Sequence, residues 1–329
     1  MPPSKRSVEN VWRQRGPPAW LLLPLGLLFF AVVALRRILY RFGILRGERL
    51  AVPVVVVGNI TAGGSGKTPL VIWLVDELGR RGRKPGVVSR GYGGGVAGVR
   101  KVSLGDTPEA VGDEPLLIAH RAGCPVVVGR DRVAAGRALL AEHPDCDVIL
   151  CDDGLQHYRL VRDVEIAVVD RRGLWNGWPL PAGPLREPIA RLDSVDAVVA
   201  NGWTGDAAFR MTLVGGEFRQ LGEVSRGATP HDLAGLRLHA VAGIGEPQRF
   251  FDHLAALGLA FTAHAFPDHH AYTAADLAFD GDAILATEKD AVKFSGLTKM
   301  AVWVLPVTAA VTPDLAQFIL EKIDGRPPA

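Results

Sequence analysis

Cysteine is scarce in this chain of 329 residues, and its scarcity excludes two sources of stability. The three cysteines, Cys124, Cys146 and Cys151, are odd in number and do not have the spacing of metal ligands. Neither a disulfide framework nor a cysteine metal site is therefore indicated, and we expect a reducing compartment. The length instead predicts two domains, each large enough to bury a hydrophobic core.

Net charge is also nearly absent, at +2, but it is unevenly distributed. Residues 1–49 contain nine Lys or Arg against two Glu, so this end carries +7 and the remainder carries −5. The excess of basic side chains therefore belongs to one end of the chain, where it would favour contact with an anionic surface.

The same end contains seventeen residues without a charge, Ala19–Leu35. As a helix this run would be about 26 Å long, against about 30 Å of hydrocarbon in a bilayer. It is marginal for a full span, and Pro24 and Gly26 weaken its first half. A cleaved signal peptide is disfavoured because no small-residue cleavage site precedes the arginines that follow. A helix buried in a core remains the other alternative.

The next turns are predicted to be an amphipathic helix. Its apolar face consists of Leu35, Ile38, Leu39, Phe42 and Leu45. The other side carries Arg36, Arg37, Arg41 and Arg46. Each Arg near an anionic membrane surface contributes about 1 kcal/mol to binding. We therefore interpret residues 1–50 as a membrane-associated helix, spanning or monotopic, that binds anionic lipids of the inner leaflet and leaves the rest in the cytoplasm.

The rest of the chain is organised around Val54–Pro69, with the sequence VVVVGNITAGGSGKTP. Four valines in a row predict a strand buried on both faces at the centre of a parallel sheet. A glycine-rich turn and a helical pattern follow, which together predict the phosphate-binding loop of P-loop nucleotide enzymes. The predicted nucleotide contacts are Thr61, Ala62, Gly63, Gly64, Ser65, Gly66, Lys67 and Thr68.

Each part of this loop has a chemical reason. Backbone N–H groups of a glycine turn can point at phosphate oxygens, Lys67 would reach the β- and γ-phosphates, and the Thr68 hydroxyl would ligate Mg²⁺. The regular motif has glycine where Thr61 stands, so the loop is a variant. An ordinary glycine turn is the alternative interpretation.

A second apolar strand is predicted in Asp147–His157 (DVILCDDGLQH), and it ends in two acidic residues of the kind that accompany a P-loop. We predict Asp152 and Asp153 as Mg²⁺ ligands, direct or through water, although two acids after a strand are common without a P-loop upstream. Two further polar groups have alternative interpretations. Arg90 follows a strand and is either a phosphate contact or a solvated loop charge. Asp113 precedes a helical pattern, which from spacing alone it would most simply cap.

Strand and helix patterns divide the chain into three parts. After the membrane segment, residues 51–204 predict a P-loop NTPase-like parallel sheet flanked by helices. Residues 205–329 predict a linker followed by a second, smaller α/β domain. The expected strands include Val164–Asp170, Val195–Asn201, Leu238–Ala242 and Ala283–Thr287. The Pro- and Gly-rich stretch Gly173–Pro188 is either an apolar surface beside the nucleotide or a packed loop.

The second domain contains Asp268-His269-His270 after a strand. With no third His or Cys nearby, a zinc site is not expected. The sequence Glu288-Lys289-Asp290 does not have the spacing of the guanine-specifying Asn-Lys-x-Asp motif, so a GTPase is not favoured.

Seven motifs follow one another along the chain: VGNITAGGSGKTP, SRGYGG, GDEP, DDGLQH, LPAGPLREP, FPDHHAY and TEKDAVK. Together with the apolar N-terminus, they resemble the tetraacyldisaccharide 4′-kinase family, membrane-associated kinases of lipid A biosynthesis, over nearly the whole length. Thr61 is similar to the family's own form of the loop, whereas Leu155 stands where the family more often has Phe.

The resemblance implies that ATP and Mg²⁺ are used to phosphorylate the 4′-hydroxyl of a tetraacylated glucosamine disaccharide 1-phosphate at the cytoplasmic face of the bacterial inner membrane. It implies that Asp113, rather than capping a helix, accepts the proton and pairs with His269 across the two domains. Further residues implied at the site are Lys67, Asp268, Arg186 and Glu187. The implied partners are the lipid disaccharide and the membrane, with no nucleic acid and no obligate protein partner.

The alternative function is a membrane-tethered P-loop ATPase switch, which would use water as the acceptor and depend on a partner for its rate. A non-enzymatic membrane scaffold would leave Lys67, Asp152 and Asp153 without a purpose.

Overall fold

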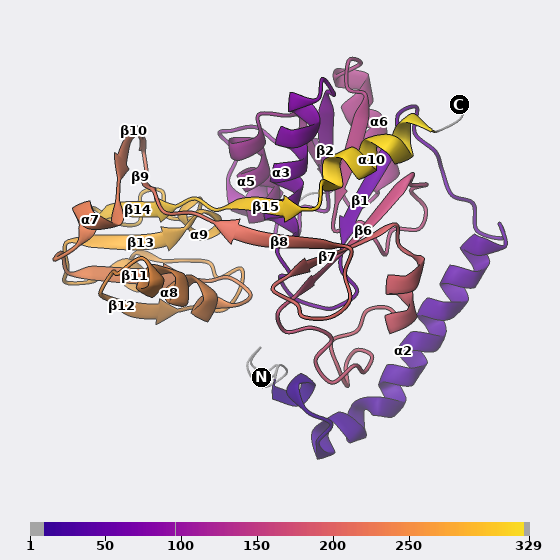
Figure 1. The fold of residues 1–329 in the computed structure, drawn as a ribbon, viewed down its shortest axis with the longest axis horizontal. Coiled ribbons are helices and arrows are strands. Elements are labelled where there is room, and N and C mark those ends of the chain that lie inside the picture. The colour runs from indigo at the N-terminus through magenta and orange to yellow at the C-terminus, as the bar shows by residue number, and fades with distance from the viewer. Residues whose placement is uncertain (1–9, 96, 326–329) are drawn as a thin grey trace.

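The computed structural model describes residues 10–95 and 97–325 and contains two sheets, each with helices around it. The larger body lies beside the smaller one, and the long helix α2 (Pro17–Arg41) runs along the outside of the larger body (Figure 1). The predicted fold class, a P-loop-like α/β core with an N-terminal apolar helix and a smaller α/β unit, is confirmed by this arrangement.

The large sheet has nine strands, and seven of them are parallel. Across the sheet, the order is β15 (Thr308–Thr312), β8 (Phe209–Val214), β7 (Ala197–Asn201), β6 (Val164–Asp170), β1 (Val54–Gly58), β5 (Val148–Asp152), β2 (Pro85–Ser89), β4 (Val126–Gly129) and β3 (Val99–Lys101). The edge strands β15 and β3 are antiparallel to their neighbours. The valine strand β1 therefore lies near the centre, as its apolar sequence predicts.

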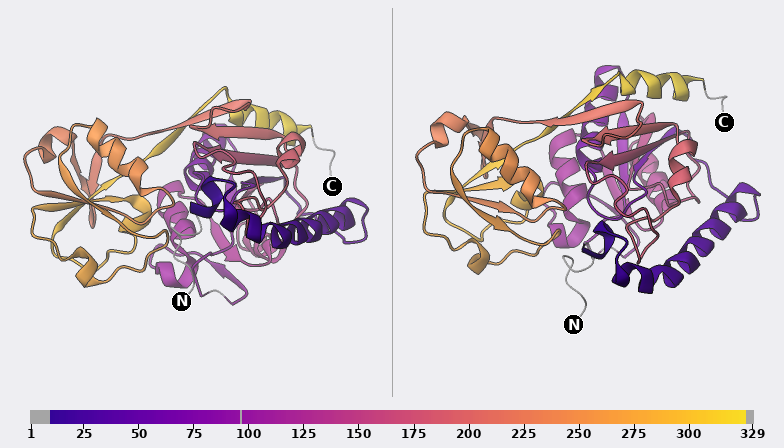
Figure 2. Two further views of the ribbon diagram at one scale, coloured as in Figure 1. Left: turned by 90° about the horizontal axis from the view of Figure 1, so that it is seen from below. Right: turned by 60° about the horizontal axis from the view of Figure 1, so that its bottom comes forward.

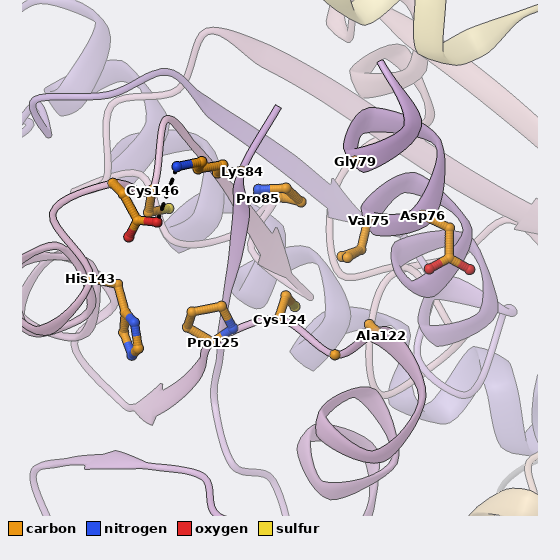
Figure 3. A pocket seen from close by; sticks show the side chains of 12 residues that line it. Val75, Asp76, Gly79, Lys84, Pro85, Ala122, Cys124, Pro125, His143 and Cys146 are labelled. Carbon is orange, nitrogen blue, oxygen red and sulfur yellow. Dashed lines mark hydrogen bonds and ion pairs between the residues drawn. The ribbon is translucent and has the colours of Figure 1, made fainter. Parts of the chain in front are cut away.

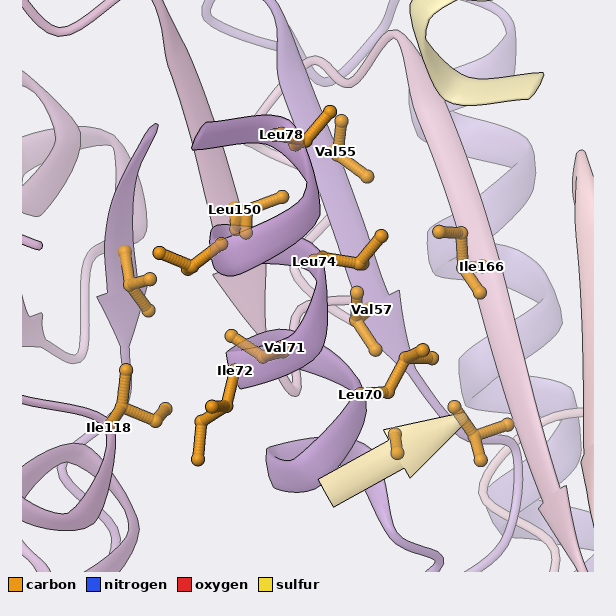
Figure 4. Packing of buried hydrophobic residues seen from close by; sticks show 14 of the residues in the cluster. Val55, Val57, Leu70, Val71, Ile72, Leu74, Leu78, Ile118, Leu150 and Ile166 are labelled. Atoms are coloured by element: carbon orange, nitrogen blue, oxygen red, sulfur yellow. The ribbon is translucent and has the colours of Figure 1, made fainter. Parts of the chain in front are cut away.

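Strand β1 is buried on both faces because its side chains alternate between two apolar layers. Val55 and Val57 pack in the layer formed by α3 (Lys67–Arg80), α5 (Asp113–Ala122) and α10 (Leu315–Asp324), where the α3 leucines lie over β1 (Figure 4). Val54 and Val56 pack in the opposite layer with α6 (Arg132–Glu142). Each such fully buried side chain contributes about 1.5–3 kcal/mol to folding.

The small sheet has six strands, four of them parallel. Their order is β10 (Glu223–Ala228), β9 (Phe218–Gln220), β14 (Ala301–Leu305), β13 (Ala283–Thr287), β11 (Leu238–Ala242) and β12 (Phe261–Ala265). The shorter elements around the two sheets are α4 (Pro108–Val111), α7 (Pro230–Leu233), α8 (Pro247–Ala256), α9 (Glu288–Ala291) and the 3₁₀ turns η1 (Ile189–Ser194) and η2 (Ala274–Leu277). The segment after Thr273 thus forms only the short turn η2.

The sheets do not divide at residue 204 as the sequence pattern predicts. Strand β8 pairs with β7 and with β15, so both β8 and β15 belong to the large sheet, and α10 packs on the same body. All six strands of the small sheet lie in the segment between these two strands, which run side by side from one body to the other (Figure 2). Both strands alternate exposed and buried positions and lack a long apolar run, which is why the sequence pattern placed them with their chain neighbours.

Among the described residues, α2 is the one helix that is long and apolar enough to cross a membrane. It is continuous through Pro24 and extends beyond the uncharged run at both ends. It stops at Arg41, so the predicted amphipathic helix does not reach Phe42 and Leu45. Most of its large apolar side chains are exposed: Trp20, Leu21, Leu25, Leu27, Leu28, Val32, Leu35 and Ile38.

Candidate active site

The loop between β1 and α3 has the geometry of a phosphate cradle. The Gly66 backbone, at φ +90°, precedes the first turn of α3, and a Cβ there would lie 2.3 Å from the Asn201 amide nitrogen. Only glycine fits this position. Thr61, which stands where the regular motif has glycine, forms an antiparallel bridge with Leu185. A β-branched residue suits that extended backbone, so the sequence variant has a local reason.

Arg186 holds this loop from the side. Its backbone N–H donates to the Ile60 carbonyl at 2.7 Å, and its Nε donates to the Thr61 carbonyl at 2.9 Å. Its guanidinium also contacts Asn59 Oδ1 and lies 3.2 Å from Asp153 Oδ2. The structure thus brings the predicted Arg186 to both the loop and the acidic strand end.

The cationic and acidic halves of the predicted site meet at the carboxyl ends of β1 and β5. Lys67 and Thr68 are buried in the first turn of α3, and Lys67 Nζ lies 3.6 Å from Asp153 Oδ1. Burial raises the pKa of Asp153, but Lys67 and Arg186 outweigh this effect and hold it well below its usual range. A permanently ionised carboxylate therefore faces the position where Lys67 would contact phosphate.

The pKa of Asp152 is shifted in the opposite direction. Burial, reinforced by the negative charge of Glu114, raises the pKa of Asp152 well above its usual value. One of its oxygens accepts from the Ser89 hydroxyl at 3.3 Å, whereas Oδ1 is buried and has no hydrogen-bond partner within the described part of the chain.

An unpartnered buried carboxylate oxygen fits a divalent cation, which would favour the ionised form of Asp152. No group of three His, Cys, Asp or Glu side chains suited to a metal occurs among residues 10–95 and 97–325. Mg²⁺ does not require one, because it is commonly held by one or two carboxylates together with phosphates and water.

A second polar cluster lies where the two bodies meet. Asp113, the first residue of α5, is buried, and both of its carboxylate oxygens lie 3.0 Å from His269 Nδ1. His269 has φ +62°, an uncommon conformation for a residue with a side chain, and its ring lies 5.2 Å from that of Tyr92. The pairing of Asp113 with His269 implied by the resemblance is therefore present in the structure.

Two lysines of the small body complete this cluster. Lys293 Nζ lies 3.0 Å from Asp113 Oδ2, and Lys289 Nζ lies 3.1 Å from Asp268 and 2.9 Å from Glu114. Burial raises the pKa of Asp113, but the hydrogen bond with His269 and the two lysine charges outweigh this and hold it well below its usual range. Asp113 is thus ionised and ready to accept a hydrogen bond from a hydroxyl group.

Residues 18–324 match the sequence model of the family described as LpxK, tetraacyldisaccharide-1-P 4′-kinase. The chain belongs to this family. It is 54% identical to the tetraacyldisaccharide 4′-kinase of Azoarcus sp. (strain BH72), over 98% of this chain and 97% of that protein. It is 53% identical to that of Dechloromonas aromatica (strain RCB), over 98% of each. A crystal structure of LpxK from Aquifex aeolicus in complex with ATP has a TM-score of 0.79 at 30% identity, covering 93% of this chain and 99% of that one.

Arg90, one residue predicted at the nucleotide of this LpxK family member, directly follows the carboxyl end of β2 and is exposed, so its contact with phosphate stays a prediction. Glu187 is fully buried behind the loop, where it accepts from Gln156 at 2.7 Å, contacts the Tyr158 hydroxyl and pairs with Arg191 at 3.3 Å. Glu187 therefore supports the loop from a second layer, because Gln156 also donates to the Asn59 carbonyl at 3.1 Å.

The stretch Gly173–Pro188 is a packed loop rather than an apolar surface open to the nucleotide. Trp178 packs edge-on against Trp20 of α2, with ring centroids 4.7 Å apart. Trp175 similarly packs against Trp12. Of the two interpretations of this stretch, the structure supports the packed one.

Several residues that support the loop have no motif of their own in the sequence. Asn201, at the end of β7, donates to the Ser65 carbonyl at 3.0 Å and accepts from Arg249 of the small body at 2.7 Å. Arg172 donates to the Gly64 carbonyl at 2.5 Å. Asn201 ends one predicted strand and Arg172 comes two residues after another, so their positions at strand ends were the available indication.

A cavity of about 390 Å³ lies far from this chemistry (Figure 3). It is lined by residues at the amino ends of β2 and β4, including Lys84, Pro85 and Cys124, whereas the P-loop follows the carboxyl end of β1. In parallel α/β sheets ligands bind at carboxyl ends, so this cavity is not assigned to the active site.

Proposed function

We propose that this protein transfers the γ-phosphoryl group of ATP to the 4′-hydroxyl of a tetraacylated glucosamine disaccharide 1-phosphate, in lipid A biosynthesis. The observation that carries the proposal is the pairing of Asp113 with His269 beside a complete phosphate cradle. A cradle alone suits any P-loop ATPase, but an ionised carboxylate oriented by a histidine suits an enzyme whose acceptor is a hydroxyl group.

The cradle supplies positioning and positive charge, which is most of what phosphoryl transfer requires from a protein. The loop amides and Lys67 would bind the triphosphate. Mg²⁺, held by Thr68 with Asp152 or Asp153, would neutralise charge on the phosphates. Arg186 keeps both the loop and Asp153 in place through the contacts described above.

On the acceptor side, the 4′-hydroxyl has to lose one proton. As the 4′-oxygen forms its bond to the γ-phosphorus, the bond from that phosphorus to the bridging oxygen of ADP breaks, and the hydroxyl proton passes to Asp113. His269 would orient the carboxylate through its Nδ1 contact, and Lys289 holds Asp268 and Glu114 close by. A carboxylate with a low pKa is a weak base, which suits a loose transition state in which the proton leaves late.

The exposed apolar side chains of α2 and the arginines near its end support attachment to anionic lipids at the cytoplasmic face of the inner membrane. A substrate with four acyl chains remains in the bilayer, so the enzyme has to work at its surface. The proposal needs neither a nucleic acid nor an obligate protein partner.

The test is incubation of the purified full chain with ATP labelled at the γ-phosphate and the lipid disaccharide in detergent micelles. We expect label on the lipid, at the 4′ position, only when Mg²⁺ is present. Release of labelled inorganic phosphate with no lipid product would instead favour the ATPase switch. Label on the lipid in the presence of excess chelator would contradict the metal assignment.

A further inference from the structure

The nucleotide loop and helix α2 are in contact with the same short segment of chain. We call residues 174–186 the clamp segment. On its inner side the Ala62 N–H donates to the Pro184 carbonyl at 2.8 Å, Thr61 bridges to Leu185, and Arg186 makes the loop contacts described above. The clamp segment thus borders the cradle through main-chain hydrogen bonds, which fix its distance from the loop.

The outer side of the clamp segment carries the N-terminal helix. Trp20 packs on Trp178, and the Trp12 indole N–H donates to the Pro181 carbonyl at 3.0 Å. Gly26 lies directly against Pro179: a Cβ there would be 3.0 Å from the proline Cγ and 3.1 Å from its carbonyl oxygen. Only the small residues Ala19 and Gly26 of α2 are buried, so the helix is seated on the clamp segment along a narrow strip.

The clamp segment itself has little freedom. The Leu180 N–H donates to the Leu185 carbonyl and the Leu185 N–H donates to the Trp178 carbonyl, each at 3.0 Å. The buried Asn176 amide donates to the Ala182 carbonyl at 2.9 Å. A Cβ at Gly183 would meet Asn176 Oδ1 at 2.2 Å. Close-packed and hydrogen-bonded segments of this kind move as a unit, so displacement of the outer side is transmitted to the inner side.

We propose that the clamp segment is a positioning element that couples the seating of α2 on the core to the geometry of the nucleotide loop. The inference rests on the proposed use of ATP and extends it: residues of a helix outside the cradle set the affinity of the cradle for ATP. Trp20 and Gly26 are the positioning residues, acting through Trp178 and Pro179 on the loop.

The decisive variant is Gly26→Leu. Leucine favours a helix more than glycine does, so the substitution strengthens α2 itself while forcing it away from Pro179. The matched control is Val32→Leu, which adds bulk at an exposed position of the same helix. We would measure the Kd for ATP by titration calorimetry of the full chain in detergent micelles without lipid substrate, together with the unfolding midpoint.

We expect Gly26→Leu to raise the Kd for ATP by about fivefold or more, the lower end of typical coupling between sites, with Val32→Leu unchanged. Trp20→Ala should also raise it, and Trp20→Phe, which restores an edge-on ring, should return it towards the wild-type value. If Gly26→Leu does not fold, the two Trp20 variants still test the inference, because neither of them introduces a clash.

The inference is overturned if folded Gly26→Leu and Trp20→Ala both bind ATP within about twofold of wild type, below the usual range of site coupling, or if Val32→Leu weakens binding equally. Failure of the proposed function would look different, because then wild type itself would bind no ATP or would label no lipid.

Discussion

The phosphate cradle and the polar cluster of Asp113, His269, Lys289 and Lys293, which we call the acceptor cluster, serve one proposed reaction. They are built from different groups of the protein. The cradle is mostly backbone, with loop residues 59–66 tied by main-chain hydrogen bonds to Pro184 and Arg186 of the same body. The acceptor cluster is mostly side-chain charge, and Asp113 meets a histidine that lies 156 residues further along the chain in the other body.

This difference decides how each part responds to change. A backbone-built site tolerates substitution except where a side chain touches the ligand or where only glycine fits, as at Gly66. A charge-built site between two bodies depends on every partner and on closure of the bodies over the substrate. Removing one charge there leaves another buried charge without its partner, which is costly.

The largest effect is expected in the acceptor cluster. Asp113→Asn keeps the shape of the side chain but removes the proton acceptor, and loss of a positioned base lowers turnover by about 10²–10⁴-fold. Turnover on the detergent-dispersed lipid would be measured beside the control Asp280→Asn, which alters an almost fully exposed carboxylate. Activity within tenfold of wild type would remove Asp113 from the mechanism.

In the cradle, we expect the largest loss of turnover at Lys67, whose positive charge would contact the triphosphate directly. Lys67→Met should lower turnover by at least about 10²-fold, because preorganised positive charge at the triphosphate is lost. Lys84→Met, at an exposed lysine beside the amino end of β2, is the control. Near-normal turnover of a folded Lys67→Met protein would contradict the phosphate-site assignment.

A smaller effect should appear where a side chain supports the backbone of the cradle. Asn201→Ala removes the hydrogen bond to the Ser65 carbonyl and the contact with Arg249. The loss of about 1 kcal/mol from one hydrogen bond would raise the KM for ATP by about fivefold, with little change in kcat. An unchanged KM for ATP would mean that the backbone contacts alone are sufficient.

The smallest effect concerns stability and pH. Burial, together with the nearby Arg132, lowers the pKa of His157 to about 4. This histidine is neutral when folded, so its contribution is complete above its ordinary pKa of about 6.5 and is lost as the pH falls from there towards 4. Because the ring is partly exposed, we expect only about 1 kcal/mol from it between pH 7.5 and 5. Urea unfolding at both pH values should show that His157→Gln loses less unfolding free energy than wild type does, by about that amount. Equal losses would mean that other groups carry the pH dependence.

The sequence predicts the cradle more fully than it predicts the cluster around Asp113. The cradle was predictable because its strand, glycine turn and helix are consecutive, and strands such as Val164–Asp170 and Ala283–Thr287 have the predicted bounds. Strands β8 and β15 fell within the predicted linker and second domain, although they pair in the large sheet, because pairing between distant, half-exposed strands leaves no local pattern. For Asp113, local spacing favoured a helix cap, and only the resemblance indicated His269, since their meeting depends on how the two bodies fold together.

The proposed mechanism requires Asp113 and His269 to act as one unit across the two bodies. The direct measurement is a double-mutant cycle on turnover with Asp113→Asn, His269→Gln and the combined variant, all checked for folding. If they form one unit, each single variant approaches the full loss and the combined variant is little worse than either. If the two losses multiply, the residues act independently, and the contact between the bodies is structural rather than part of the reaction.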